Sequence, residues 1–169
     1  MERVWVFDRL AVSVTRVDFL DPEVAGTSDA RERGVRIEVR PAVWRATGSI
    51  YASNTCELHP AVCRVDFLES SPGAADRMHW HPQMQDGEPG DRTFDVGMPA
   101  DPVAWLARFW ETLDEFLAGA GEAEPTPGDL RGVRAATDDI GSAVAHGLAW
   151  AREPWPEVVH DARGMAPVA

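Results

Sequence analysis

The spacing of apolar residues changes once along this chain, and that change restricts the fold more than any other feature of the sequence. In the first half, apolar residues recur at every second position, most clearly within 10–14, 35–39 and 63–67, as half-buried strands require. In the second half they recur at helical spacing, within 103–117 and 130–151. Strands therefore come first and helices follow.

This order predicts an α+β fold, in which an N-terminal antiparallel sheet of about five strands, within residues 3–82, carries two C-terminal helices packed on it. We expect one domain over residues 1–169, divided into a strand-rich part (1–98), a helical part (101–153) and an irregular tail (154–169). The sequence contains neither a glycine-rich dinucleotide fingerprint nor a G-x-S-x-G nucleophile motif, which argues against two large classes of enzyme.

Turn and cap residues mark the expected boundaries of these elements. The polar stretch 21–34, punctuated by glycine and proline, predicts a loop between the first two strands. Asp101 followed by Pro102 predicts a helix start, because aspartate caps free N–H groups and proline fits the first helical position. The stretch 119–128 predicts a linker, and a second helix is expected over residues 129–152.

A pentapeptide, Arg-Val-Asp-Phe-Leu, occurs twice, at residues 16–20 and 64–68. The similarity does not extend into a tandem repeat, so we interpret the two copies as strands with equivalent roles in one sheet. We expect them to be neighbours. If they pair antiparallel in register, the arginine of each copy faces the aspartate of the other across the strands.

The chain is strongly acidic, and its basic residues are of one kind. Against 28 Asp and Glu stand 16 basic residues, all of them arginine, so the net charge is −12 at pH 7. Such a surface repels phosphate backbones and anionic lipid, so we expect no nucleic-acid partner and no membrane partner. The absence of lysine excludes a P-loop and any mechanism that needs a lysine Schiff base.

The expected compartment is the cytoplasm. Residues 1–8 lack the apolar run of a signal peptide, and no stretch approaches the roughly 20 apolar residues of a membrane span. The two cysteines, Cys56 and Cys63, are too few for a disulfide framework. Together these features favour a soluble, cytoplasmic protein with reduced cysteines.

The densest group of polar residues lies between Asp76 and Asp95. Within it, His79 and His81 are spaced i, i+2, so that on a strand both imidazoles point to one face, as two ligands of one metal ion must. Met78 and Trp80 then point to the opposite face and anchor the strand in the core. We therefore expect both imidazoles to border a concave, partly solvated site.

Residues of the following loop complete the predicted site. Asp86 is the expected third metal ligand, with Glu88 as its alternative, and Glu88 and Arg92 are the predicted catalytic residues. In this interpretation the guanidinium of Arg92, or that of Arg77, binds an anionic group of the substrate. The glycine and proline residues of 87–95 predict that the loop folds back over the histidines.

The spacing of these residues resembles the first metal motif of the cupins, in which five residues separate a glycine from His-x-His and a glutamate follows after three or four more. Here five residues separate Gly73 from His79, and Asp86 follows His81 after four. The chain departs from the family in having aspartate for glutamate and in lacking the second, downstream histidine motif. From this resemblance we retain the ligand spacing and not the family.

Other cysteines and histidines form weaker candidates. Cys56-x2-His59-x3-Cys63 has the ligand types of a zinc site. Cys63, however, falls on the apolar face of its strand, which favours a buried side chain that packs in the core. We expect both cysteines to be reduced and to be needed neither for folding nor for activity. His146 could add a ligand from the second helix, although a helix-surface histidine is the commoner arrangement.

Two functions of different classes remain open. The first is a metal-dependent enzyme acting on a small molecule, with a divalent ion (Fe, Zn or Mn) held by two histidines and a carboxylate. The second is a non-catalytic binding or accessory domain, which uses the loop from Asp76 to Asp95 as a contact surface for a protein partner. Both allow a homo-oligomer.

Overall fold

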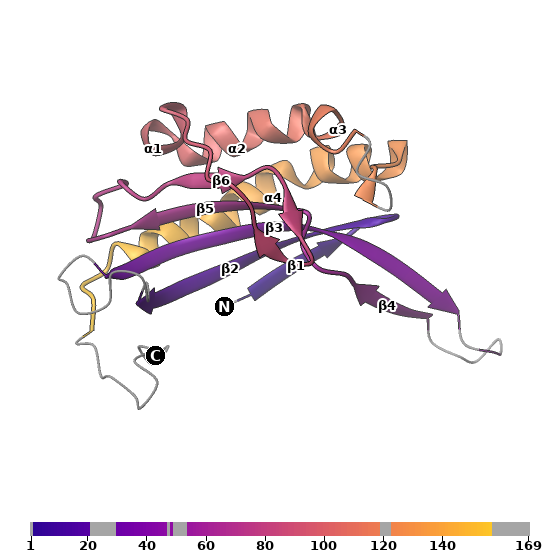
Figure 1. Ribbon diagram of the computed structural model, residues 1–169, viewed down its shortest axis with the longest axis horizontal. Helices are drawn as coiled ribbons and strands as arrows, with labels where there is room; N and C mark the ends of the chain where they lie inside the picture. Colours follow the sequence, from indigo (N-terminus) through magenta and orange to yellow (C-terminus); the bar gives the residue numbers. More distant parts are fainter. Residues whose placement is uncertain (1, 21–29, 47, 49–53, 119–122, 157–169) are drawn as a thin grey trace.

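The protein consists of an antiparallel sheet with helices on one face (Figure 1), which confirms the predicted α+β class. The computed structural model describes residues 2–20, 30–46, 48, 54–118 and 123–156, and every structural statement below concerns these residues. The strands of the main sheet are β1 (Glu2–Val6), β2 (Leu10–Leu20), β3 (Arg31–Ala46), β4 (Asn54–Leu58), β5 (Cys63–Glu69) and β6 (His79–His81). A separate small pair is formed by β7 (Met84–Gln85) and β8 (Glu88–Pro89), and the helices are α1 (Gly97–Ala100), α2 (Pro102–Glu111), α3 (Leu113–Phe116) and α4 (Pro127–Ala151).

The order of strands in the main sheet is β1-β2-β3-β5-β6, and β4 pairs with the far end of β3. Strand β3 is the longest and pairs with β2, β4 and β5. It begins at Arg31, inside the stretch 21–34 that was expected to be a loop, of which residues 21–29 lie outside the described part. The strand continues through polar positions because the guanidinium groups of Arg31 and Arg33 stack on Trp155 and Trp150.

The helices begin where their caps place them. The carboxylate of Asp101 accepts a hydrogen bond from the N–H of Ala104 at 3.0 Å, which confirms the predicted start of α2. The expected long helix breaks at Thr112, after which the chain resumes as α3. Helix α4 begins at Pro127, two residues before the expected start, because Thr126 is its N-cap and forms a capping box with Asp129.

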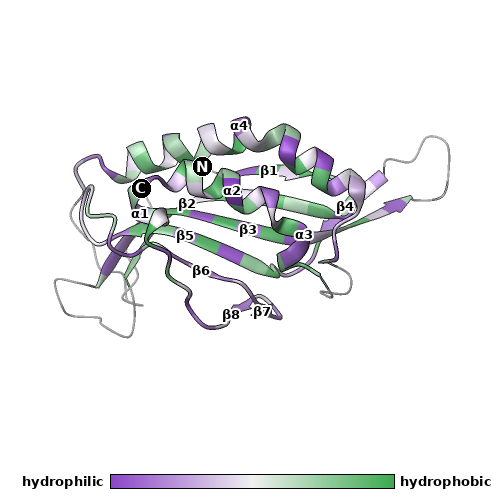
Figure 2. Ribbon diagram, turned by 90° about the horizontal axis from the view of Figure 1, so that it is seen from above, coloured by the Kyte–Doolittle hydropathy of each residue, from purple (hydrophilic) through white to green (hydrophobic). Residues whose placement is uncertain are grey.

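A single apolar cluster joins the inner face of the sheet to the helices. Phe67 of β5 meets Trp105 of α2 edge to face, with ring centroids 6.1 Å apart. Gly147 lets α4 lie directly on β3, since a Cβ at this position would stand 2.4 Å from Cγ2 of Val35. The cluster also buries Met78 and Trp80, as predicted for the apolar face of the strand that carries the histidines. Figure 2 shows β7 and β8 beyond β6, at the edge of the sheet that is farthest from α4.

The two copies of the pentapeptide are not neighbours, so that prediction was wrong. They lie in β2 and β5, which flank β3 on opposite sides. Strand β3 therefore supplies the arginine partners of both copies: Asp18 binds Arg31 at 2.7 Å, and Asp66 binds Arg36 at 2.7 Å. The copies do have equivalent positions, since each is an antiparallel neighbour of the same central strand.

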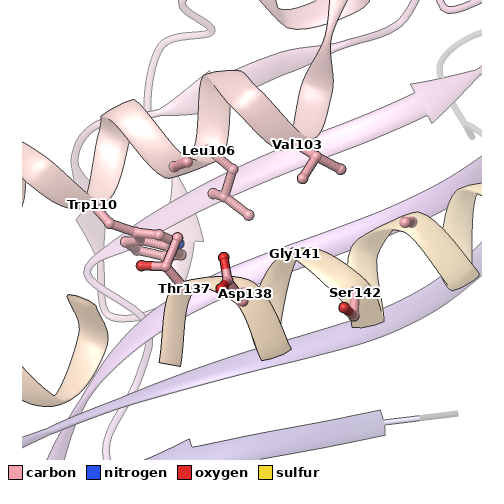
Figure 3. A pocket seen from close by; sticks show the side chains of 9 residues that line it. Val103, Leu106, Trp110, Thr137, Asp138, Gly141 and Ser142 are labelled. Carbon is pink, nitrogen blue, oxygen red and sulfur yellow. The ribbon is translucent and has the colours of Figure 1, made fainter. Parts of the chain in front are cut away.

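A shallow groove of about 340 Å³ runs between α2 and α4 on the helical side of the protein (Figure 3). Val103, Leu106 and Trp110 line it from α2, and Thr137 and Gly141 are among its residues from α4. Asp138 is the one ionisable residue in this lining. Of the helices in the described ranges, none has the length and apolar character needed to cross a membrane.

Candidate metal centre

The face of the sheet opposite the helices carries charged and imidazole side chains instead of a second apolar layer. The strand register places Arg36, Asp66 and His79 side by side on β3, β5 and β6. The next row along the strands repeats the arrangement, because Glu38 lies beside Arg64, and Arg64 beside His81. The strict alternation of apolar and polar residues on β3 and β5 produces this polar face.

Three side chains of these rows form a compact set of metal-ligating groups. Each of Asp66, His79 and His81 offers one ligand atom, and these atoms all lie within 4.8 Å of one another. The ligand atoms around a tetrahedral ion, each about 2.1 Å from it, stand about 3.4 Å apart, so the three groups need only a small movement to meet at one ion. Within the described part of the chain, this trio is the only group of three or more histidine, cysteine, aspartate or glutamate residues whose ligand atoms lie this close together.

The backbone fixes both imidazoles in the tautomer that a metal needs. Nδ1 of His79 lies 2.9 Å from the carbonyl oxygen of Arg77, and Nδ1 of His81 lies 2.8 Å from that of Gly90. A carbonyl oxygen only accepts hydrogen bonds, so each Nδ1 carries the proton and donates it. The lone pair of each imidazole is therefore on Nε2, as in metal-binding histidines whose other nitrogen is held by a carbonyl or carboxylate.

The electrostatic surroundings keep His79 neutral. Burial lowers the pKa of His79 below its ordinary value, and the charge of Arg92 and the neighbouring His81 act in the same direction. The hydrogen bond to the carbonyl of Arg77 and the nearby charge of Asp66 oppose this shift without cancelling it. A neutral imidazole is the form that binds a metal ion.

Arg36 binds both oxygens of Asp66, one at short and one at long distance. Nε of Arg36 donates to Oδ1 at 2.7 Å and Nη2 donates to Oδ2 at 3.4 Å, and Oδ2 also lies 3.7 Å from Nε2 of His79. The neighbouring Arg64 does not compete for this carboxylate, because its Nε and Nη2 both donate to Glu38, at 3.0 and 2.9 Å. Oδ2 of Asp66, whose hydrogen bond from Arg36 is the longer one, is therefore the oxygen that faces the candidate metal ligands.

A hollow of about 290 Å³ opens in front of the trio. Its floor is the polar face of the sheet, and its wall includes Pro89, Gly90 and Arg92 from the loop that follows β6. The prediction that this loop folds back over the histidines is therefore confirmed. The hollow lies on the opposite side of the sheet from the groove between α2 and α4, since Trp80 points to the helices and its neighbours His79 and His81 point away.

The structure distributes the predicted site residues unequally. His79 and His81 lie together, and Arg92 lines the same hollow. Asp86, the expected third ligand, is exposed in the turn between β7 and β8 and is not part of the trio. Glu88 is also exposed and borders a different depression, next to Pro82 and Asp91. Asp66, on β5, is the carboxylate that lies with the two histidines.

Two further expectations about the histidines and their neighbours change. Both imidazoles border a concave hollow, as expected, but the histidines are themselves buried, with 3% of His79 and 4% of His81 exposed, whereas neither was expected to be a core residue. The main sheet, one antiparallel layer covered by helices, also differs from the double-sheet jelly roll of the cupins. The spacing of the two histidines thus corresponds to two members of the trio, whereas Asp86 is not among its members.

The other candidate ligands do not come together. Cys63 is buried in the core, which raises its pKa to about 12, and Cys56 lies on the neighbouring β4 arm. Both cysteines are free, as predicted. His146 is exposed on α4, on the helical side of the sheet. Neither these residues nor His59 join a group of three ligands in the described ranges, and His160 lies outside them.

Comparison of this chain with models of protein families, with curated proteins and with solved structures finds no match. The chemistry of the site therefore rests on its own residues. Two imidazoles and one carboxylate on one side of a cavity form a ligand set that leaves coordination positions open toward the cavity.

Proposed function

We propose that the protein binds a divalent transition metal through Nε2 of His79, Nε2 of His81 and Oδ2 of Asp66, and uses it to act on a small molecule. The observation that carries the proposal is the orientation of the imidazoles, whose Nδ1 atoms both donate to backbone carbonyls. Because Nδ1 of each buried ring donates to a carbonyl, Nε2 keeps its lone pair for a ligand. Here two adjacent rings are fixed in the same tautomer, with a carboxylate beside them.

The proposed ion is iron, zinc or manganese. Iron(II) accepts two histidines and one carboxylate with open positions for its reactants, and zinc accepts the same set with a water in the fourth position. Manganese favours oxygen ligands, which the substrate and water would supply. The protein contributes three ligands and a hollow of about 290 Å³, a volume that fits a small molecule and not a polymer.

We place the protein in the cytoplasm, where its two free cysteines stay reduced.

Metal binding is tested with the full chain, purified without a histidine tag and titrated calorimetrically with Zn²⁺, Mn²⁺ and, under anaerobic conditions, Fe²⁺. The informative variants are His79→Asn and His81→Asn, because the Asn amide nitrogen can replace Nδ1 as donor to the carbonyl while the ligand atom Nε2 is lost. The matched control is His146→Asn, on the exposed face of α4.

We expect the wild type and the control to bind one ion and each site variant to lose at least about tenfold in affinity. The site variants also lose about 1–3 kcal/mol of stability, because the histidines are buried, so their folding is checked by circular dichroism. A wild type that binds none of the three metals, or site variants that bind as well as the wild type, would contradict the metal centre. Enzymatic activity is then tested as the conversion of small molecules by the metal-loaded wild type. This conversion should stop when a chelator removes the metal, and the His79→Asn variant should not show it.

One observation favours the alternative function, a non-catalytic binding domain. Phe94 and Val96, at the end of the loop beyond the hollow, are 67% and 93% exposed. Exposed apolar side chains on a polar loop are typical of contact surfaces. In this alternative a protein partner covers both residues, and a Phe94→Ser, Val96→Ser double variant would lose the partner while it retains metal binding.

A further inference from the structure

Arg92 combines a fixed backbone with an uncommitted side chain. On one side of it, the N–H and carbonyl of Thr93 pair with the carbonyl and N–H of Trp80, at 2.8 and 3.0 Å. On the other side, Gly90 donates its N–H to the carbonyl of Gln83 at 3.2 Å and accepts the proton of His81. The chain is thus attached to β6 and to the residues after it on both sides of Arg92, so the guanidinium starts from a defined position at the hollow.

The other charged groups at the hollow neutralise one another. Arg36 is paired with Asp66, and Arg64 with Glu38. Burial raises the pKa of Glu38, but the hydrogen bonds from Arg40 and Arg64 outweigh this effect and lower it, so Glu38 stays ionised.

Glu32, which also lines the hollow, lies 3.7 Å from Arg77. In contrast, no hydrogen bond or ion pair engages the guanidinium of Arg92 among the residues that the structure describes. One positive charge therefore faces the hollow without a counterion, in a chain whose net charge is −12. A bound divalent ion would add to this local positive charge.

The remaining wall of the hollow is apolar. Phe19, Leu68 and Pro89 line it beside the polar groups. A cavity of about 290 Å³ lies at the lower end of the range that holds small organic ligands. The hollow therefore offers an apolar wall, one free guanidinium and the three candidate metal ligands within a space for a few non-hydrogen atoms.

We propose that this hollow binds a small 2-hydroxy or 2-oxo carboxylic acid, with its carboxylate on Arg92 and its neighbouring oxygen directed to Asp66, His79 and His81. This inference rests on the proposed metal centre, which supplies the positive partner of the hydroxyl or keto oxygen. A guanidinium binds a carboxylate through two parallel N–H bonds, so one arginine fixes both the position and the orientation of the acid. The apolar wall accommodates the short carbon chain. Phosphate offers Arg92 the same oxygen chemistry, and the experiment separates the two anions.

The test uses the full-length protein, loaded with zinc and in metal-free form, and three probes: lactate, propionate and inorganic phosphate. Lactate and propionate differ only in the 2-hydroxyl group, so their comparison isolates the contribution of the metal-facing oxygen. Binding is followed by calorimetric titration for the wild type, for Arg92→Gln and for Arg45→Gln. Arg45 is the matched control, because it is an exposed arginine on β3 remote from the hollow.

We expect lactate to bind the zinc-loaded wild type at least about tenfold more tightly than propionate or phosphate, and at least about tenfold more tightly than it binds Arg92→Gln. Arg45→Gln should match the wild type, and zinc affinity should be the same in all three proteins. Phosphate binding that exceeds lactate binding, or lactate binding that is unchanged in Arg92→Gln, overturns the inference and leaves the metal centre intact. If zinc itself does not bind, the proposed function fails. The carboxylate class of ligand is then supported only if propionate binds the metal-free wild type and does not bind Arg92→Gln.

Discussion

Nδ1 of His81 lies 2.8 Å from the carbonyl oxygen of Gly90, nine residues further along the chain. This hydrogen bond connects the strand that carries the candidate ligands with the loop that closes the hollow. It fixes the tautomer of His81, and it holds the loop backbone next to Arg92. The loop thus has two roles at the site, since it orients a ligand and presents the cation.

Replacement of Gly90 by alanine should weaken metal binding without unfolding the protein. A Cβ at this position would stand 2.7 Å from the carbonyl oxygen of Gln83, which is too close, so the loop must shift. The shift removes the acceptor of the His81 proton. We expect about a tenfold loss of zinc affinity, measured by calorimetric titration, with little change in the circular dichroism spectrum.

The control for Gly90→Ala is Gln85→Ala, an exposed residue of the same loop that does not line the hollow. It should leave the affinity for zinc unchanged. Equal losses in both variants would indicate a general disturbance of the loop. An unchanged affinity in Gly90→Ala would show that the hydrogen bond to His81 does not orient the ligand.

The fold was largely predictable because two periodic signals dominate the sequence. The alternation over 35–39 and the helical spacing over 130–151 correspond to β3 and α4. The extension of β3 back to Arg31 was not predictable, because its polar side chains are stabilised by tryptophans of the C-terminal region, more than a hundred residues away. A local pattern carries no information about such distant partners.

The site was predictable only in part, for a related reason. The i, i+2 spacing of His79 and His81 is a local signal, and it identified both imidazoles. Asp66 lies on another strand, and only the register of β5 with β6 places it opposite His79. The alternation of Arg64, Asp66 and the core residues did put Asp66 on the polar face, but a sequence does not state which strands pair. The loop carboxylates are closer to the histidines in sequence, and Asp86 also has the cupin-like spacing, so both local signals favour the loop over Asp66.

Gly34 should be among the least replaceable residues of the sheet. A Cβ there would stand 2.1 Å from the carbonyl oxygen of Phe67 and 2.9 Å from Cα of Leu68, both backbone atoms of β5. Gly34→Ala must therefore push β3 and β5 apart, and we expect a loss of about 2–3 kcal/mol in the free energy of unfolding. Denaturant titration measures this loss.

The comparison variant for Gly34 is Gly141→Ala in α4, where a Cβ would contact only a side-chain methyl of Val103, at 3.1 Å. Alanine is the better helix former, so this variant should stay within about 1 kcal/mol of the wild type. A Gly34→Ala protein as stable as Gly141→Ala would mean that the two strands are less closely packed than described.

The buried carboxylate of Asp129 should make stability depend on pH. It accepts hydrogen bonds from the N–H groups of Arg9, Leu10 and Thr126, and so attaches the start of α4 to the turn between β1 and β2. Burial raises its pKa, but these hydrogen bonds outweigh burial, and the pKa lies below the ordinary value. Such a group stabilises the folded state above the unfolded pKa of about 3.9, and this contribution is lost as pH falls through the lower, folded pKa.

We therefore expect Asp129→Asn to be less stable than the wild type by about 2 kcal/mol at pH 7, with the difference shrinking as the pH falls below about 4. Urea titrations at a series of pH values measure both proteins. Asp138→Asn, exposed on the same helix, is the control and should follow the wild type. A difference that stays constant from pH 7 to pH 3 would assign the effect of Asp129 to packing and not to its charge.

The identity of the carboxylate ligand gives the sharpest test of the metal centre, because the sequence pattern predicts Asp86 and the structure has Asp66 beside the histidines. Asp66 presents Oδ2 toward His79 at 3.7 Å, whereas Asp86 is exposed in the turn between β7 and β8. Asp66→Asn keeps an oxygen that can accept the hydrogen bond from Arg36 and removes the negative charge that a metal ion needs. We expect Asp66→Asn to lose at least about tenfold in affinity for zinc, and Asp86→Asn to bind zinc as the wild type does. Calorimetric titration of the two variants side by side decides between the two carboxylates. A loss of affinity confined to Asp86→Asn would mean that the β7–β8 turn closes onto the histidines. The carboxylate ligand would then be Asp86, the residue that the cupin-like spacing predicts.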